Sequence, residues 1–227
     1  MQYYLELDNI SLVTSQRALI DEHGNCLPSI AASRCLVEQT SRINGVQLAN
    51  KILTEFLNYI GEATTVLFKK EHVDECFGVY LGRHYKSMGD VTQWLELLRK
   101  GDAVYIKDVL SCFRQHADQN SHNVKLHLNA LTDTFQCITD SYHYGQFISS
   151  RQEYLGLIFR WVRWSAGTLR PFFHSGVTKL PEVKKYEEYM FYMRCLQIAR
   201  GMLEGHQECE KLFNEVDGVL AVYFDIQ

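Results

Sequence analysis

Proline is scarce in this chain of 227 residues. Only Pro28, Pro171 and Pro181 are present, whereas average usage would give about eleven. Proline lacks a backbone N–H and interrupts helices, so its scarcity leaves long stretches of the chain free to be helical. This feature favours a helical fold.

Long apolar runs are absent as well. Val219–Phe224 is among the longest, far short of the roughly 18 residues that a membrane-spanning helix needs. The first residues, from Met1 to Asp8, lack the basic region and the long apolar region of a signal peptide. We therefore expect no membrane contact and a cytoplasmic location.

The cysteines form no paired motif. Seven are scattered along the chain without a C-x-x-C pair, at Cys26, Cys35, Cys76, Cys112, Cys137, Cys195 and Cys209. An odd number in such an arrangement, without an export signal, predicts reduced thiols in a cytosol.

Charge and missing motifs count against several classes of function. The net charge of −4 and the pI of about 6.1 disfavour broad binding to nucleic acid, although a local basic patch is compatible with them. The glycine-rich phosphate loops, the G-x-S-x-G of esterases and the H-E-x-x-H of zinc proteases are absent. We expect no cofactor.

A helical hairpin is predicted near the middle of the chain. Asp90 and Gln93 have the spacing of a capping box, and an apolar stripe follows them. Gly101 can end this helix, and Asp102 can cap a second one that runs to about Gln119. Two helices joined by so tight a turn form an antiparallel hairpin.

The remaining apolar spacing also indicates helices, at residues 29–61, 121–142, 149–171, 181–204 and 207–215. The first of these segments could form one long helix or two shorter ones interrupted at Asn44 and Gly45. Residues 3–10 and 218–224 are instead rich in aromatic and β-branched residues, and a short strand is predicted at Arg17–Ile20.

We therefore predict a mainly α, single-domain helical bundle of about six to eight helices over residues 1–227. The bundle itself would occupy residues 29–216. Residues 1–28 would contain β-structure and residues 217–227 a strand, so that a small sheet joins the two ends.

The helix predicted at 149–171 concentrates arginine and tryptophan. The residues that we predict to bind a partner are Arg160, Trp161, Arg163, Trp164 and Arg170. Arginine and tryptophan are enriched at interaction hot spots, and Arg160 and Trp164 lie one turn apart, so that guanidinium can stack on indole. The same spacing fits core packing of the tryptophans with the arginines reaching water, and contact with single-stranded nucleic acid is a third interpretation.

The segment after Arg200 has the opposite charge. Its acidic residues are Glu204, Glu208, Glu210, Glu215, Asp217 and Asp225, against the single basic residue Lys211. The arginine-rich helix could therefore dock on this segment, within the chain or in a neighbouring copy, which is one route to self-association.

Two catalytic alternatives stay open. Cys112 and His116 are four apart on a predicted helix and would share a face, as two ligands of one metal require, but no zinc signature is matched and no metal is predicted. Arg200 and His206 resemble the R-x(4–6)-H pattern of the HEPN ribonucleases, which implies cleavage of RNA at a helix end. Gly201 departs from that pattern, because those families usually place a polar residue after the arginine.

The sequence thus favours a non-catalytic cytoplasmic subunit that binds a protein partner, or further copies of itself, through the arginine–tryptophan helix. The reasons are the missing catalytic and cofactor motifs and the single aromatic–basic stripe. The alternatives are a HEPN-like ribonuclease and a metal-dependent helical enzyme.

Overall fold

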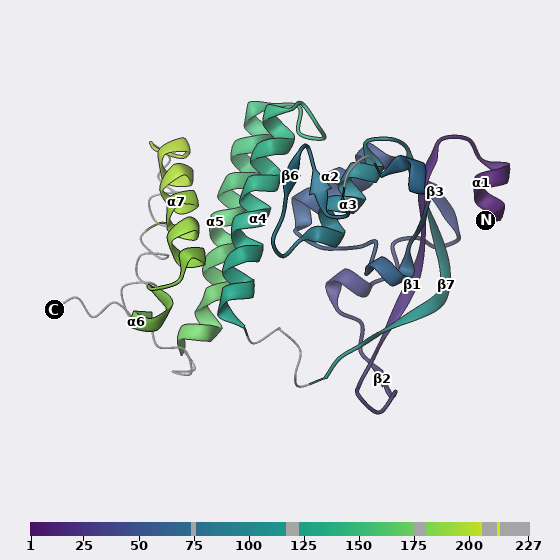
Figure 1. The fold of residues 1–227 in the computed structure, drawn as a ribbon, viewed down its shortest axis with the longest axis horizontal. Coiled ribbons are helices and arrows are strands. Elements are labelled where there is room, and N and C mark those ends of the chain that lie inside the picture. The colour runs from purple at the N-terminus through teal and green to yellow at the C-terminus, as the bar shows by residue number, and fades with distance from the viewer. Residues whose placement is uncertain (74–75, 117–122, 175–179, 206–212, 214–227) are drawn as a thin grey trace. The chain divides into compact units, whose positions relative to one another are not determined.

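The chain divides into two compact units, Met1–Gln119 (unit 1) and Asn120–Gln227 (unit 2). The computed structural model describes residues 1–73, 76–116, 123–174, 180–205 and 213 (Figure 1). Unit 1 combines two sheets with helices, and the described residues of unit 2 form helices. The prediction of one domain over residues 1–227 stays a prediction.

Unit 1 is built on a mixed five-stranded sheet in the order β2-β1-β7-β3, with β4 also paired to β1. Its strands are β1 (Ile10–Ile20), β2 (Cys26–Leu27), β3 (Ser41–Ile43), β4 (Leu67–Phe68) and β7 (Asp102–Arg114). The two long strands, β1 and β7, run parallel, and the other three pair antiparallel to them. A separate hairpin joins β5 (Val79–Tyr80) to β6 (Arg83–His84). The predicted mainly α bundle over residues 29–216 is therefore wrong, and the fold is mixed α/β.

The largest error concerns β7, which occupies the segment predicted as the second helix of the hairpin. Its first four residues, which include Ala103, Val104 and Tyr105, are buried without alternation, as in a strand covered on both faces. Such a run does not distinguish a strand from a buried helix by periodicity alone. The segment is a strand because it pairs with β1. Its β-branched and aromatic residues are of the types that are common in paired strands.

The N-terminal segment also differs from the prediction. Residues 3–10 were predicted to form a strand, but the short helix α1 (Gln2–Glu6) occupies most of them, and β1 begins at Ile10. The strand predicted at Arg17–Ile20 is the end of β1. The strand predicted at 217–227, and the sheet that would join the two ends, lie outside the described residues.

Helices α2 (Gly45–Glu55) and α3 (Gly89–Leu98) pack on one face of the large sheet (Figure 1). They share a core with β1 that includes Leu12, Leu48, Ile52, Trp94 and Leu95. Helix α3 confirms the first helix of the predicted hairpin. The predicted capping box does not form, because the Gln93 oxygen accepts from the backbone N–H of Gly78 at 3.1 Å.

The start of α2 is fixed against the start of β7. The Asp102 carboxylate accepts from the Arg42 guanidinium at 2.6 Å and from the backbone N–H of Gly45 at 2.9 Å. A Cβ on Gly45 would lie 2.2 Å from the Gly101 carbonyl oxygen, so only glycine permits this approach of the two backbones. Asp102, predicted to cap a helix of its own, thus stabilises the N-terminus of α2.

A buried arginine on β1 organises the loops beside the sheet. The Arg17 side chain is 6% exposed, and its Nε lies 3.4 Å from the Glu62 carboxylate. Its Nη2 donates to the carbonyl oxygens of Ala32, at 3.0 Å, and Asn58, at 2.8 Å. One side chain therefore connects β1 to the loops on either side of α2.

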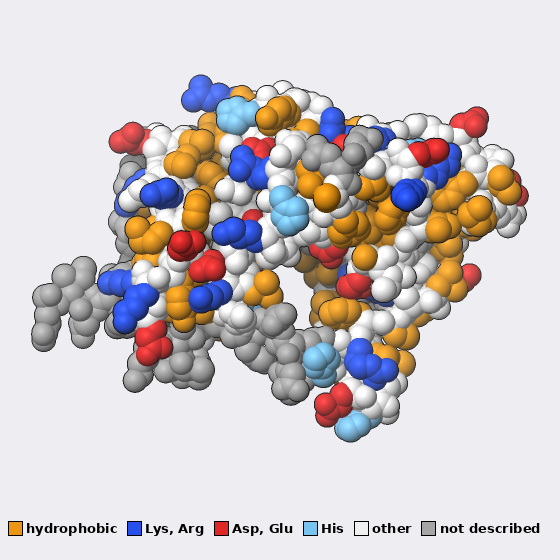
Figure 2. Space-filling view, in the orientation of Figure 1, with side chains coloured by type: hydrophobic (Ala, Val, Ile, Leu, Met, Phe, Trp, Pro, Cys, Tyr) orange, Lys and Arg blue, Asp and Glu red, His pale blue; other side chains and the backbone are white. Residues whose placement is uncertain are grey.

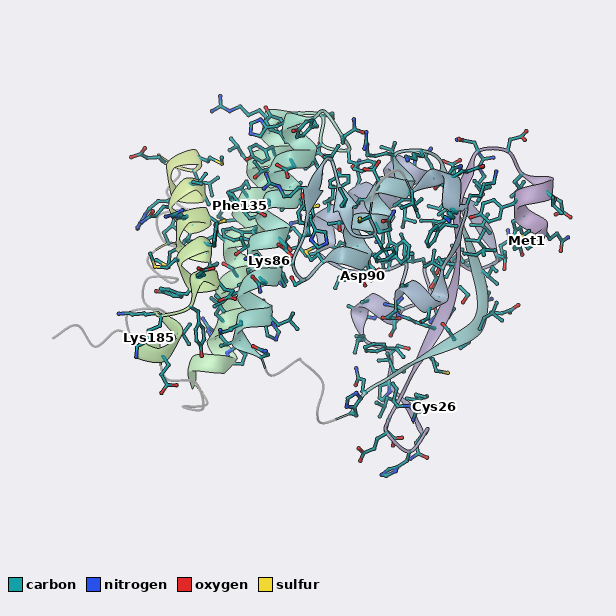
Figure 3. The ribbon with its side chains drawn as sticks, in the orientation of Figure 1. Met1, Cys26, Lys86, Asp90, Phe135 and Lys185 are labelled. Atoms are coloured by element: carbon teal, nitrogen blue, oxygen red, sulfur yellow. The ribbon has the colours of Figure 1, made fainter. Side chains whose placement is uncertain are left out.

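Asp90, a partly buried carboxyl labelled in Figure 3, is linked to the same cluster through Asn58. Asp90 accepts from the Asn58 amide at 2.9 Å and from the backbone N–H of Val91 at 2.7 Å. Burial disfavours its charged form and raises its pKa above the ordinary value, and the nearby Glu62 raises it further.

Unit 2 packs three long helices, α4 (Val124–His143), α5 (Arg151–His174) and α7 (Glu187–Met202), with the short α6 (Leu180–Val183) before the last. The helices predicted at 121–142 and 149–171 are confirmed within a few residues. The one predicted at 181–204 is split into α6 and α7. The helix predicted at 207–215 lies outside the described residues except for Phe213.

We predict that Asp102→Asn lowers the free energy of unfolding by about 2 kcal/mol, because it removes a charge-assisted pair with Arg42. Urea unfolding measures the change. The matched control is Asp108→Asn on the exposed part of β7, which should stay within about 0.5 kcal/mol of the wild type. Equal effects of the two substitutions would contradict this account.

The Asp90 environment predicts a pH effect of defined sign. The Asp90 carboxyl binds its proton more tightly in the folded protein than in the unfolded chain. Its ionisation, as the pH rises above the ordinary aspartate pKa of about 4, therefore destabilises the fold. The stability of the wild type relative to Asp90→Asn should therefore fall as the pH rises from about 4. Urea unfolding across a pH series tests this, and a constant or rising difference would refute it.

Candidate functional site

The second face of the large sheet is only partly covered by helix α1, which lies on the opposite side from α2 and α3 (Figure 1). Tyr3, Tyr4 and Leu7 from this segment pack against the buried residues Ile10 and Val13 of β1. The Tyr4 hydroxyl donates to the Leu67 carbonyl oxygen at 2.8 Å, which ties α1 to β4.

Two hollows flank α1. The larger, of about 750 Å³, is lined by Met1, Tyr4, Leu67, Phe68, Lys69, Lys70 and Glu71. The smaller, of about 330 Å³, shares Met1 and Leu67 and reaches the middle of β1 and β7. Both volumes are in the range of ligand-binding pockets, and hydrophobic side chains gather on the surface around α1 and β7 (Figure 2).

Bulges in β7 form one wall of the smaller hollow. Ser15 pairs with Ile106 whereas the next residue, Gln16, pairs with Val109, so two extra residues are inserted in β7. A further residue, Leu110, is inserted before Ser111. Bulges redirect side chains, and here Leu110 is 66% exposed at the rim of the hollow.

Several polar groups of the hollows pair with other groups of the chain. Thr14 and Thr65 donate to carbonyl oxygens of the chain, and Lys69 lies 3.6 Å from the Glu71 carboxylate. Burial raises the pKa of Tyr4 to about 12, so its hydroxyl is a donor at neutral pH. The Ser111 Oγ is buried and has no hydrogen-bond partner among the described residues. The described lining residues show no nucleophile paired with a base.

The structure separates the predicted partner-binding residues of α5. Trp161 is fully buried, and its Nε1 donates to the Leu131 carbonyl oxygen at 2.8 Å. Its ring packs against Phe135 and Tyr192, with centroids 4.9 and 5.9 Å away. Trp164 is half-buried, and the predicted arginines Arg160, Arg163 and Arg170 are exposed. Trp161 therefore belongs to the core, whereas the arginines lie on the surface of the helix.

The two catalytic pairs are not assembled by the described residues. Cys112 lies on β7 and His116 follows it, so their predicted common helix face is wrong. Four residues of extended chain span about 13 Å, too far for both to bind one metal. Arg200 is exposed at the end of α7 with its guanidinium 5.2 Å from the Phe213 ring centre, and His206 lies outside the described residues. Within the described ranges, no group of three His, Cys, Asp or Glu side chains could hold a metal ion.

Comparison with protein-family models, with curated proteins and with solved structures finds no match for this chain. Across the described residues, every helix is too short or too polar to cross a lipid bilayer.

Sequence reasoning missed the α1 face. Val109 and Leu110 lie within the segment predicted as the second helix of the hairpin, whereas both are exposed on a bulged strand. The usable signal was the adjacent pair of apolar residues directly after the charged Lys107 and Asp108, which fits a bulge better than strict alternation.

We predict that Trp161→Phe lowers the free energy of unfolding by about 2 kcal/mol, since it leaves a small void and removes the hydrogen bond from the indole to the Leu131 carbonyl oxygen. Arg163→Ala, two residues along the same helix, should change stability by less than about 0.5 kcal/mol. Thermal or urea unfolding of the two variants checks the difference. A neutral Trp161→Phe would show that this side chain is not part of the core.

Proposed function

We propose that this chain is a non-catalytic protein-interaction or assembly subunit whose main docking surface is the α1 face of unit 1. The observation that carries the proposal is the meeting of Met1, Leu67 and Leu110 at one hollow, with exposed fractions of 78%, 43% and 66%. Single exposed apolar residues are ordinary, but a contiguous group around a hollow is characteristic of an interaction site.

The chemistry of the hollows indicates the kind of partner. Their walls are mainly apolar, and the charged lining residues are Lys70 and the exposed pair Lys69 and Glu71. An apolar side chain or a short apolar segment of a protein fits such a surface, because it gains burial without losing hydration of a charge. Nucleic acid is disfavoured, since the described hollows offer no basic groove for phosphates.

The exposed arginines of α5 are a second candidate surface for a partner, in keeping with the proposal made from the sequence. Arg160, Arg163 and Arg170 lie on one long helix and present guanidinium groups to the surroundings. Such groups suit an acidic partner surface. The hollow at α1 is preferred as the main site because it offers apolar burial.

A cytoplasmic location is part of the proposal. Four cysteines, Cys26, Cys35, Cys76 and Cys112, are exposed as free thiols, which persist in reducing compartments. Neither the ribonuclease nor the metal-dependent alternative gains support from an observation on the described residues.

Photo-cross-linking in the native cell tests the proposal. A benzophenone side chain at position 110 should yield a discrete adduct of protein mass, whereas the same group at the exposed position 39 should not. A second protein carries the benzophenone at position 67 together with Leu110→Asp. The substitution should reduce the yield of the adduct at least about tenfold. It should change the free energy of unfolding by less than about 0.5 kcal/mol.

The outcomes separate the possibilities. An adduct of twice the chain mass identifies the partner as a second copy. An adduct at position 163 but none at 110 moves the docking surface to α5 and overturns the assignment of the site. No adduct at either position contradicts the proposed function.

A further inference from the structure

One edge of β7 is paired over only a short part of its length. Strand β3 pairs with β7 at Ala103, Val104 and Tyr105. Directly after them, the backbone N–H of Lys107 donates to Thr40 Oγ1 at 3.2 Å. Beyond this point β1 still lies on one side of β7, and no described strand lies on the other (Figure 1). The second half of β7 is therefore an edge strand.

The backbone of Cys112 faces this open edge. The pairing of β7 with β1 is regular over Ser111–Arg114, after the bulges. The N–H of Gln115 donates to the Ile20 carbonyl oxygen at 2.7 Å, so Gln115 directs its backbone groups toward β1. Successive residues of a strand direct these groups to opposite edges, so Phe113 also faces β1 and Cys112 faces away from it. The outward N–H and C=O of Cys112 have no partner among the described residues.

This outward donor and acceptor define the kind of molecule that fits the edge. An extended polypeptide presents its own N–H and C=O groups at the spacing of a strand, so that pairing satisfies the donor and the acceptor together. A helix does not, because its backbone groups are bonded to one another. The edge is therefore suited to an added strand.

The open edge is continuous with the smaller hollow of the α1 face. Leu110 and Ser111, which directly precede Cys112, line that hollow, and Leu110 is 66% exposed at its rim. Every second side chain of an added strand points to the same face of the sheet. An apolar side chain on the α1 face would be buried against Leu110, so the hollow provides specificity and the edge provides backbone hydrogen bonds.

We propose that the protein partner adds an extended segment as a strand to the open edge of β7, at Ser111–Gln115, with an apolar side chain buried against Leu110. This inference rests on the proposed docking function of the α1 face and specifies how the partner is held. A second copy of the chain and the chain's own residues are the alternative occupants that the experiments distinguish.

Hydrogen exchange of the purified wild type tests whether the edge is open. The amide of Cys112 should exchange at least about tenfold faster than that of Phe113, because only the Phe113 amide is directed at β1. Exchange followed by NMR gives both rates. Equal protection of the two amides would mean that this chain or a second copy already occupies the edge, which would overturn the proposal.

Cross-linking in the native cell tests the added strand. Three chains that carry the benzophenone at position 67 are compared, namely the otherwise unchanged chain, Cys112→Pro and the matched control Cys112→Ser. Proline removes the N–H that would bond to the partner, and an edge position tolerates it because this N–H has no partner within the chain. The adduct should fall at least about tenfold with Cys112→Pro and stay within about twofold with Cys112→Ser.

The outcomes separate this inference from the proposed function. An adduct that survives in a folded Cys112→Pro overturns the strand pairing and leaves the α1 face as the docking surface. An adduct of twice the chain mass replaces the partner with a second copy, and no adduct in the otherwise unchanged chain contradicts the docking function itself. If urea unfolding shows that Cys112→Pro does not fold, a benzophenone at position 112 replaces it. An added strand lies beside that position, so an adduct at 110 without one at 112 would also overturn the proposal.

Discussion

The burial of Arg17 within β1 is the constraint on which the arrangement of unit 1 depends. A guanidinium that is 6% exposed is tolerated only with compensating partners, and here these are the Glu62 carboxylate and the carbonyl oxygens of Ala32 and Asn58. Those partners belong to loops on both sides of α2, so the charge that must be compensated also fixes the loops. The same cluster holds Asp90 through Asn58, which extends the constraint to the start of α3.

This constraint positions the α1 face. The loop fixed at Asn58 and Glu62 continues into Thr64, Thr65 and β4, which line the hollows beside α1. The opposite wall comes from the bulges of β7, which turn Leu110 outward because β7 has more residues than its partner β1 over the same length. The sheet thus carries an exposed apolar rim, which is the feature on which the proposed docking role rests.

Much of unit 2 could be predicted from the sequence, and much of unit 1 could not. Helices α4 and α5 follow from local apolar spacing, which the residues themselves display. Strands β1 and β7 pair across most of unit 1, and their buried halves show neither clear alternation nor helical periodicity, so the pairing was not visible locally. For the same reason Gln93 was predicted to cap its own helix, whereas its partner, Gly78, lies on another segment. The predicted arginines of α5 are exposed, but Trp161 shows that an arginine–tryptophan stripe can be half surface and half core.

Native mass spectrometry of gently purified, untagged protein, with the wild type and Leu110→Asp measured side by side, tests the central claim most directly. The account predicts that the wild type retains a second protein mass, from a partner or another copy, while the variant is measured as a bare chain of 26.4 kDa. A bare chain in both samples, or the same complex in both, would contradict the claim that the α1 face is the docking surface.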